Sequence, residues 1–239
     1  MLKEMTFFEH LSELRSRLII IILSIMLFAV VGYFFSENII NLLLESSGSS
    51  VSKFQVLYVT SMFMTKINIA IFVGIILSFP IILYQILMFI RPAFSDELNF
   101  IKVLLFIILS IFLFLLGIIF GYYILIPISV NFFNSISLNL LNSVNLNYTL
   151  ESYLIYLSWI LLVSSTIYQL PILLLLLVKI NILDIDTLKN KRPIIIVVFF
   201  IIAALLTPPD PFSQLLVALP MILLYEITIL IIRLLVREK

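Results

Sequence analysis

The chain has 239 residues, of which 63% are hydrophobic and 11% are charged, and its net charge is +1. A soluble domain of this size is close to half apolar and a quarter charged, so this composition excludes an ordinary soluble fold and requires lipid to cover part of the surface. The near-neutral charge provides no field that would attract nucleic acid. The absence of cysteine excludes disulfides and thiolate chemistry.

Before the first apolar run, the sequence predicts an amphipathic helix on the cytoplasmic surface over residues 1–17. Thr6 and Glu9 have the spacing of a capping box. Glu9, Glu13 and Arg17 then recur at helical spacing, opposite an apolar face. The pattern is equally typical of a solvated helix start whose acids complement the helix dipole. The residues alone leave both interpretations open.

Six apolar runs then predict membrane-spanning helices, because about 20 apolar residues cross the hydrocarbon core. The predicted fold class is all-α: a polytopic membrane protein with six transmembrane helices in a single integral membrane domain, residues 1–239. The fifth run would rise only about 20 Å, which predicts a short final helix pair and leaves a re-entrant hairpin as the alternative. The predicted spans are about 18–35, 67–90, 103–126, 154–178, 194–206 and 215–232.

The basic residues predict the orientation of these spans, because lysine and arginine favour the cytoplasmic side. With six spans, twelve of the 14 basic residues lie on the side of the two termini, and only Lys53 and Lys66 lie opposite. Both termini are therefore predicted to be cytoplasmic. The long outer loops, 36–66 and 127–153, are predicted to contain short amphipathic helices.

Prolines and isolated polar residues predict where the bundle departs from regular packing. Pro80, Pro171 and Pro220 are expected to break three spans, which favours a curved bundle with a concave face. Glu226 in the last span is a functional candidate, since a carboxyl group in hydrocarbon is costly. Gln169 in the fourth span has either a functional role or a role in holding helices together. It shares a helix face with Ser158 and Ser165, for which ordinary interhelical contact is the preferred interpretation.

No enzyme motif is present: the chain has no H-E-x-x-H, no G-x-S-x-G and no phosphate-binding glycine loop. The single histidine cannot build a metal site, so no catalytic residue, metal or cofactor is predicted. The remaining classes are a transporter, a channel or a translocase subunit. One alternative is a small-solute or ion-coupled secondary transporter that uses Glu226, and an intramembrane hydrolase is disfavoured by the missing motifs.

Five local strings, in order along the chain, resemble the TatC family, the core subunit of the twin-arginine protein translocase. They cover nearly the whole sequence, and their ordered set is specific although each alone is weak. The strings are F-E-H-L-S-E-L-R-S-R-L at 8–18, F-P-I-I-L-Y-Q at 79–85, K-R-P at 191–193, T-P-P-D-P-F-S-Q at 207–214 and L-P-M-I-L-L-Y-E at 219–226.

This resemblance implies a receptor and scaffold in a bacterial inner membrane, or its organellar equivalent, that exports folded proteins with the proton gradient. It implies that carboxylates bind the two arginines of the signal peptide: Glu13 matches the first acid, and Glu97 or Asp96 fills the second position, with Glu9 and Arg17 nearby. A rigid guanidinium fork suits such carboxylates. The implied partners are TatA- or TatB-like single-span subunits in an oligomeric complex. The resemblance assigns their contacts to positions matched by Gln169, Thr207 and Gln214, where Gln169 replaces a common acid.

Overall fold

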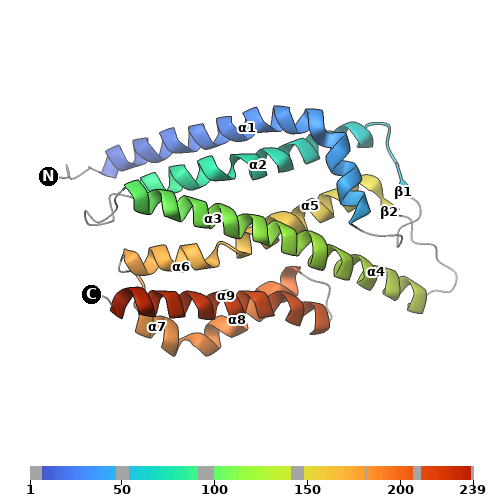
Figure 1. Ribbon diagram of the computed structural model, residues 1–239. Helices are drawn as coiled ribbons and strands as arrows, with labels where there is room; N and C mark the ends of the chain where they lie inside the picture. The colour runs from blue at the N-terminus through green and yellow to red at the C-terminus, as the bar shows by residue number, and fades with distance from the viewer. Residues whose placement is uncertain are drawn as a thin grey trace. The chain divides into compact units, whose positions relative to one another are not determined.

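The computed structural model describes residues 7–46, 54–90, 100–140, 148–180, 182–206 and 211–237 (Figure 1). This part of the chain is almost entirely helical, as predicted. Its elements are α1 (Phe7–Glu45), β1 (Phe54–Gln55), α2 (Ser61–Ile90), α3 (Phe100–Phe120), the π-helical turn η3 (Gly121–Leu125), α4 (Ile126–Leu140), β2 (Tyr148–Thr149), α5 (Leu150–Ile167), α6 (Leu170–Lys179), α7 (Ile185–Asn190), α8 (Arg192–Leu206) and α9 (Pro211–Arg237).

Within the described residues, five helical stretches are long and apolar enough to cross a membrane, and α8 is a shorter apolar helix. The five stretches are Phe8–Glu45, Ser61–Ile90, Val103–Phe132, Leu150–Lys179 and Gln214–Arg233. Because lipid offers no hydrogen bonds to the backbone, helices are the natural form for such sequences. The result confirms an all-helical polytopic membrane protein. Two paired strands of two residues each, β1 and β2, are the small departure from the predicted class.

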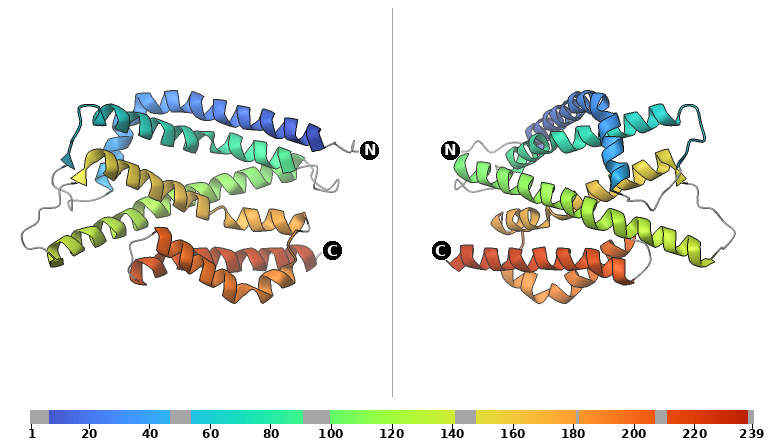
Figure 2. Two further views of the ribbon diagram at one scale, coloured as in Figure 1. Left: turned by 180° about the vertical axis from the view of Figure 1, so that it is seen from behind. Right: turned by 45° about the vertical axis from the view of Figure 1, so that its right-hand side comes forward.

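The first compact unit comprises α1 as far as Leu42, α2, and α3 as far as Phe112. The helices α1 and α2 run side by side (Figures 1 and 2). Glycine makes this approach possible, because an ideal Cβ at Gly74 would lie 2.7 Å from the carbonyl oxygen of Ile25. A Cβ at Gly32 would lie 2.9 Å from the carbonyl oxygen of Ala70. Two glycines therefore fix the spacing of this helix pair.

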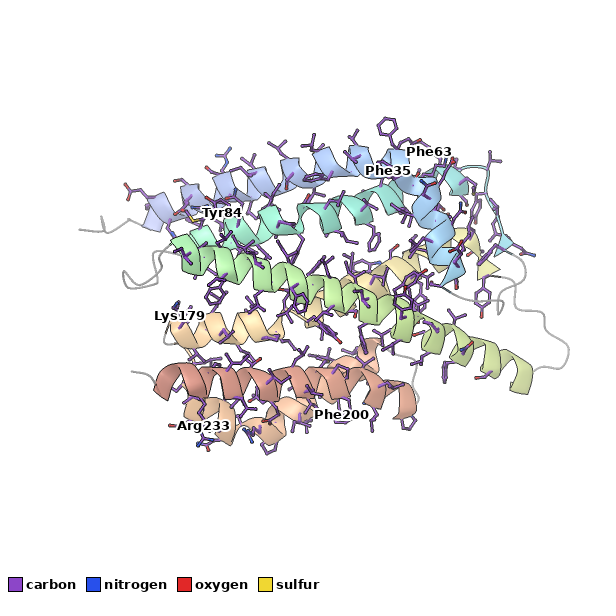
Figure 3. The ribbon with its side chains drawn as sticks, in the orientation of Figure 1. Phe35, Phe63, Tyr84, Lys179, Phe200 and Arg233 are labelled. Carbon is purple, nitrogen blue, oxygen red and sulfur yellow. The ribbon has the colours of Figure 1, made fainter. Side chains whose placement is uncertain are left out.

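Helix α1 is much longer than the predicted first span of 18–35. It begins at Phe7, so the predicted N-terminal amphipathic helix runs without a break into the apolar segment. Beyond Phe35 the helix turns and continues to Glu45 (Figures 1 and 3). The first helical segment predicted in the outer loop is thus the bent end of α1, and the second is α4. Thr6, the predicted cap, lies outside the described residues.

The second compact unit comprises Leu43–Gln55 and Leu113–Lys239. Its last two helices, α8 and α9, form a hairpin, and α6 and α7 also contact α9 (Figure 2). Met221 and Tyr225 on α9 and Leu154 and Leu157 on α5 are almost fully buried. The side chain of Ser164 on α5 donates a hydrogen bond to the carbonyl oxygen of Gly117 on α3. The core of this unit is therefore apolar, with a few hydroxyl contacts between helices.

The prediction that three prolines break three spans is wrong for two of them. Helices α2 and α9 continue through Pro80 and Pro220. Only the fourth span is interrupted: α5 ends at Ile167, and Pro171 lies in the first turn of α6. Proline in the first turn removes no hydrogen bond from the helix, because the amide hydrogens of that turn have no partner within the helix. The predicted span of 154–178 is consequently two helices joined at Tyr168 and Gln169.

Candidate functional site

Three polar residues of α1 lie beside two residues near the end of α2. We call this group the Glu13 cluster: His10, Glu13, Arg17, Gln85 and Phe89. Glu13 and Arg17 stand one helical turn apart, so their side chains meet on the same face of α1. The Arg17 Nε and Nη2 atoms both donate to Glu13 Oε1, at 2.9 and 2.5 Å. Arg17 Nη1 donates to Gln85 Oε1 at 3.0 Å and thereby links α1 to α2.

The two oxygens of the Glu13 carboxylate have different surroundings. Oε1 accepts both hydrogen bonds from Arg17. Oε2 is buried and accepts no hydrogen bond from any residue that the structure describes. The His10 Nδ1 atom lies 3.6 Å from Oε2. The Glu13 cluster therefore contains a carboxylate oxygen with unused capacity to accept a hydrogen bond, and burial withdraws this oxygen from solvent.

The surroundings restrict the motion of this group. The Arg17 and Glu13 side chains are 19% and 21% exposed, and Gln85 is buried. The imidazole of His10 stacks on the ring of Phe89, with centroids 4.3 Å apart. A charged pair that is mostly withdrawn from water interacts more strongly than an exposed one.

Of the residues predicted to bind a signal peptide, the structure brings Glu13 and Arg17 together. Glu9 lies one turn before Glu13 on the same helix, in an exposed position, and its carbonyl oxygen accepts a hydrogen bond from Ser12. Asp96 and Glu97 lie outside the described residues. Sequence reasoning missed Gln85, which ends a family-like string but gives no sign that its partner is 68 residues away.

Glu226 is not an isolated charge in an apolar span. Its Oε2 forms an ion pair with Arg192 Nη2 at 3.1 Å. Arg192 is the first residue of α8, and the two side chains are 41% and 37% exposed. Tyr225, the residue before Glu226, donates its hydroxyl proton to the carbonyl oxygen of Leu188 at 2.7 Å. These contacts hold α7, α8 and α9 together and give Glu226 a structural partner.

The remaining predicted polar positions also lie in the second unit. Gln169 occupies the break between α5 and α6 and is the residue that precedes α6. Ser158 and Ser165 donate to carbonyl oxygens of their own helix, as expected for ordinary structural hydroxyls. Gln214 on α9 donates to the carbonyl oxygen of Phe200 on α8 at 2.9 Å. Thr207 lies outside the described residues.

An open pocket of apolar character lies in the second unit. It is lined by Leu125, Ser129, Tyr156, Trp159, Ile160, Val163, Ser164, Ile167 and Leu205. Among the residues that the structure describes, no three acidic, histidine or cysteine side chains are grouped to hold a metal ion. The interactions that the described residues offer are the pairing of carboxylates with arginine side chains and the packing of apolar surfaces.

The long apolar helices define an integral membrane protein. Sequence comparison then identifies the family. The family model for the Sec-independent protein translocase protein TatC matches residues 9–220, and this chain belongs to that family. The family is one of transport proteins of the bacterial cytoplasmic membrane and not of enzymes.

Several relatives match almost the full length of the chain. The TatC protein of Carboxydothermus hydrogenoformans is 35% identical over 231 residues, covering 96% of this chain and 93% of that protein. The TatC protein of Haemophilus influenzae is 36% identical over 228 residues, covering 94% and 87%. A crystal structure of the twin-arginine translocase receptor TatC matches with a TM-score of 0.78 and 30% identity, covering 95% of this chain and 99% of that one. The alternative of a small-solute transporter is set aside by these matches.

Proposed function

We propose that this chain is the signal-peptide receptor and core scaffold of a twin-arginine translocase, which exports folded proteins across the cytoplasmic membrane with the proton gradient. Membership of the TatC family and the fold shared with a twin-arginine translocase receptor support this function. The observation that carries the proposal to particular residues is the mostly buried carboxylate of Glu13, which lies beside Arg17 in the Glu13 cluster.

The physical chemistry of the guanidinium group suits this site. A hydrogen bond to a charged partner contributes about 1.5–3 kcal/mol, and arginine presents its donors in a fixed plane. In this proposal, Glu13 binds one arginine of the signal peptide, while Glu97 or Asp96 binds the other. Glu9 adds negative charge to the same helix. Two acids placed in this way favour paired arginines over one arginine or two lysines.

We further propose six membrane spans in a single curved membrane domain with a concave face and both termini in the cytoplasm. The distribution of basic residues supports this topology. Of the final pair, α8 is short, with 15 residues, whereas α9 has 27. Cysteine replacing Asn190 is expected to react only from the cytoplasmic side, and cysteine replacing Asn41 or Ser213 only from outside. Cytoplasmic labelling at position 213 would favour a re-entrant hairpin.

Single-span TatA- or TatB-like subunits are the proposed protein partners in an oligomeric complex. We propose Gln169, Thr207 and Gln214 as their contact positions, with Glu226 holding the last two helices in place through Arg192. Glutamine both donates and accepts, so Gln169 pairs with a neutral or an acidic group without needing a proton. Gln169→Leu should therefore impair transport while signal-peptide binding remains.

The function is tested by crosslinking a twin-arginine signal peptide to the full chain in membranes. A variant with Glu13→Ala, Asp96→Ala and Glu97→Ala should accumulate in the membrane but should lose the crosslink, because no carboxylate remains for either arginine. A crosslink of normal yield in this triple variant would contradict the proposed receptor site. Ser78→Ala, which removes a buried hydroxyl elsewhere on α2, is the matched control.

A further inference from the structure

We propose that the apolar pocket of the second unit binds one acyl chain of a membrane lipid. The pocket has a volume of about 180 Å³ and is partly open. None of the residues proposed above to bind a signal peptide or a single-span subunit lines it. The site therefore goes beyond the proposed function and can be tested separately from it.

The pocket is a groove that follows helix α5. Six of its lining residues lie on one stripe of this helix, because they are separated by three, four, seven, eight and eleven positions from the first: Tyr156, Trp159, Ile160, Val163, Ser164 and Ile167. From the first to the last, the stripe rises about 16 Å at about 1.5 Å per residue. This length is close to half of the hydrocarbon core, which is about 30 Å thick. Because α5 belongs to a stretch that is long and apolar enough to cross a membrane, the groove has the direction and the length of a lipid chain in one leaflet.

The opposite wall of the groove comes from the segment that follows α3. Leu125 ends the π-helical turn η3, which packs against α5, and Ser129 stands one helical turn later on α4. Among the lining residues, Leu125 and Ile160 are buried, whereas Trp159 and Leu205 are 61% and 81% exposed. The groove therefore has a buried floor and an exposed apolar rim.

The hydroxyl groups of the groove already have partners. Ser164 donates a hydrogen bond to the carbonyl oxygen of Gly117 at 2.7 Å, and Tyr156 and Ser129 are hydrogen-bonded to each other. A water molecule in a cavity needs two to four polar partners, and an apolar cavity of about 150 Å³ stays dry and accepts an apolar molecule. The groove therefore favours an apolar occupant over water.

The width of the groove and its surroundings favour a lipid chain over a helix of a protein partner. A helix with its side chains is about 10–12 Å wide, so it can place only a side chain or two in a groove of this volume. An acyl chain is narrow enough to lie along the whole stripe. The rim also continues into a lipid-facing surface, because Val197, Ile201 and Leu205 are exposed on one face of α8. A lipid at this surface can insert one of its chains into the groove.

The test uses the fluorescence of Trp159, the only tryptophan of the chain. The full chain in detergent is titrated with phosphatidylcholine whose acyl chains carry bromine atoms, which quench tryptophan. The reference variant combines Trp159→Phe with Val197→Trp and so moves the tryptophan to the exposed face of α8. Quenching of Trp159 should saturate and should need about tenfold less lipid than quenching in the reference variant, a ratio that corresponds to about 1.4 kcal/mol. Phosphatidylcholine without bromine should reverse it. Equal lipid requirements at the two positions would overturn the proposal.

A substitution that fills the groove tests the place of binding. Val163→Phe puts a ring in the middle of the stripe, one turn after Trp159, and should abolish the saturable quenching. Val197→Phe makes the same change on the exposed face of α8 and should leave the titration as in the wild type. If Val163→Phe does not accumulate, Ile167→Phe fills the end of the groove and should have the same effect. Saturable quenching of wild-type strength in a folded groove-filling variant would overturn the proposal.

The position of the bromine atoms tests the direction of the bound chain. Trp159 lies in the half of the groove that is nearer to the start of α5, where the apolar stretch ends and the lipid headgroup belongs. Bromine near the headgroup should therefore quench Trp159 more strongly than bromine near the end of the chain. Equal quenching by the two lipids would show that no chain lies along α5.

Discussion

In the first unit Glu13 accepts two hydrogen bonds from Arg17, whereas in the second unit Glu226 forms one ion pair with Arg192, beside a tyrosine that is itself hydrogen-bonded. Each unit also contains a glutamine that bridges two helices: Gln85 accepts from an arginine side chain, and Gln214 donates to a backbone carbonyl. The same residue types thus join α1 to α2 in the first unit and α8 to α9 in the second. Glu13 is also the more buried of the two glutamates, at 21% exposed against 37% for Glu226. Residue type alone therefore does not make a binding site, and the place of the residue in the fold also counts.

The largest expected effect separates the two glutamates. Glu13→Gln keeps the size of the side chain but removes the charge that binds the signal peptide. Export of a twin-arginine substrate should fall at least about tenfold, which corresponds to loss of one charged hydrogen bond. Glu226→Gln should export at a rate close to the wild type once protein levels are equalised, because the Glu226 pair serves the hairpin. Export assays in cells with quantified membrane levels make this comparison. Equal losses in both variants would contradict the division of roles.

A second prediction concerns packing in the second unit. A Cβ at Gly117 would lie 2.6 Å from the Cα atom of Ser165, a backbone atom that cannot move aside. A Cβ at Gly121 would lie 3.0 Å from the Leu161 Cδ2 atom, at the end of a flexible side chain. Gly117→Ala should therefore lower the free energy of unfolding by about 1–3 kcal/mol, and Gly121→Ala by less. Thermal unfolding in detergent measures both. A greater loss for Gly121→Ala would show that the close approach at Gly117 has been misjudged.

Helix α1 and the prolines show how far the sequence predicts the fold. Apolar runs predict where helices occur, since burial of the backbone in lipid requires helices. They do not predict that α1 continues without a break to Glu45, because polar residues interrupt the apolar run after Phe35. The presence of a proline does not predict whether a helix is interrupted either. Pro80 lies inside a continuous helix, whereas Pro171 lies in the first turn of a new one.

The candidate site was predictable only in part, because spacing along one helix is visible in the sequence and the register between two helices is not. The spacing of Glu13 and Arg17 places them on one face of a helix, and family resemblance gives Glu13 its role. The contact between Arg17 and Gln85 depends on the register of α1 against α2, which the close approach at Gly32 and Gly74 sets. The Arg192–Glu226 pair depends in the same way on the register of α8 against α9.

A third prediction concerns the hydroxyl of Tyr225. Tyr225→Phe keeps the ring that packs on Phe199 but removes the donor to the Leu188 carbonyl oxygen. The free energy of unfolding should fall by about 1–2 kcal/mol, because that carbonyl then loses its side-chain donor in a buried place. Signal-peptide affinity of the folded protein should not change. A lower affinity with unchanged stability would place a function of the receptor in the second unit.

The smallest expected effect is at the exposed ion pair between Lys66 and Glu37, in the first unit. Glu37 is largely exposed and Lys66 partly so, and exposed pairs of this kind contribute little. Lys66→Gln should alter neither the unfolding temperature nor peptide binding measurably. A clear loss of binding would show that the receptor function of the first unit extends beyond the Glu13 cluster.

The most direct test of the central claim uses the absence of cysteine from the chain. A single cysteine replaces either Ser16, on the α1 segment that carries Glu13, or Asn190, in the second unit at a position also predicted to be cytoplasmic. Each variant is mixed in membranes with a signal peptide that carries a cysteine next to its two arginines, and disulfide formation is measured. If Glu13 binds the signal peptide, position 16 should form a crosslink that Glu13→Gln abolishes, and position 190 should form none above background. A crosslink from position 190 that equals or exceeds the one from position 16 would contradict it.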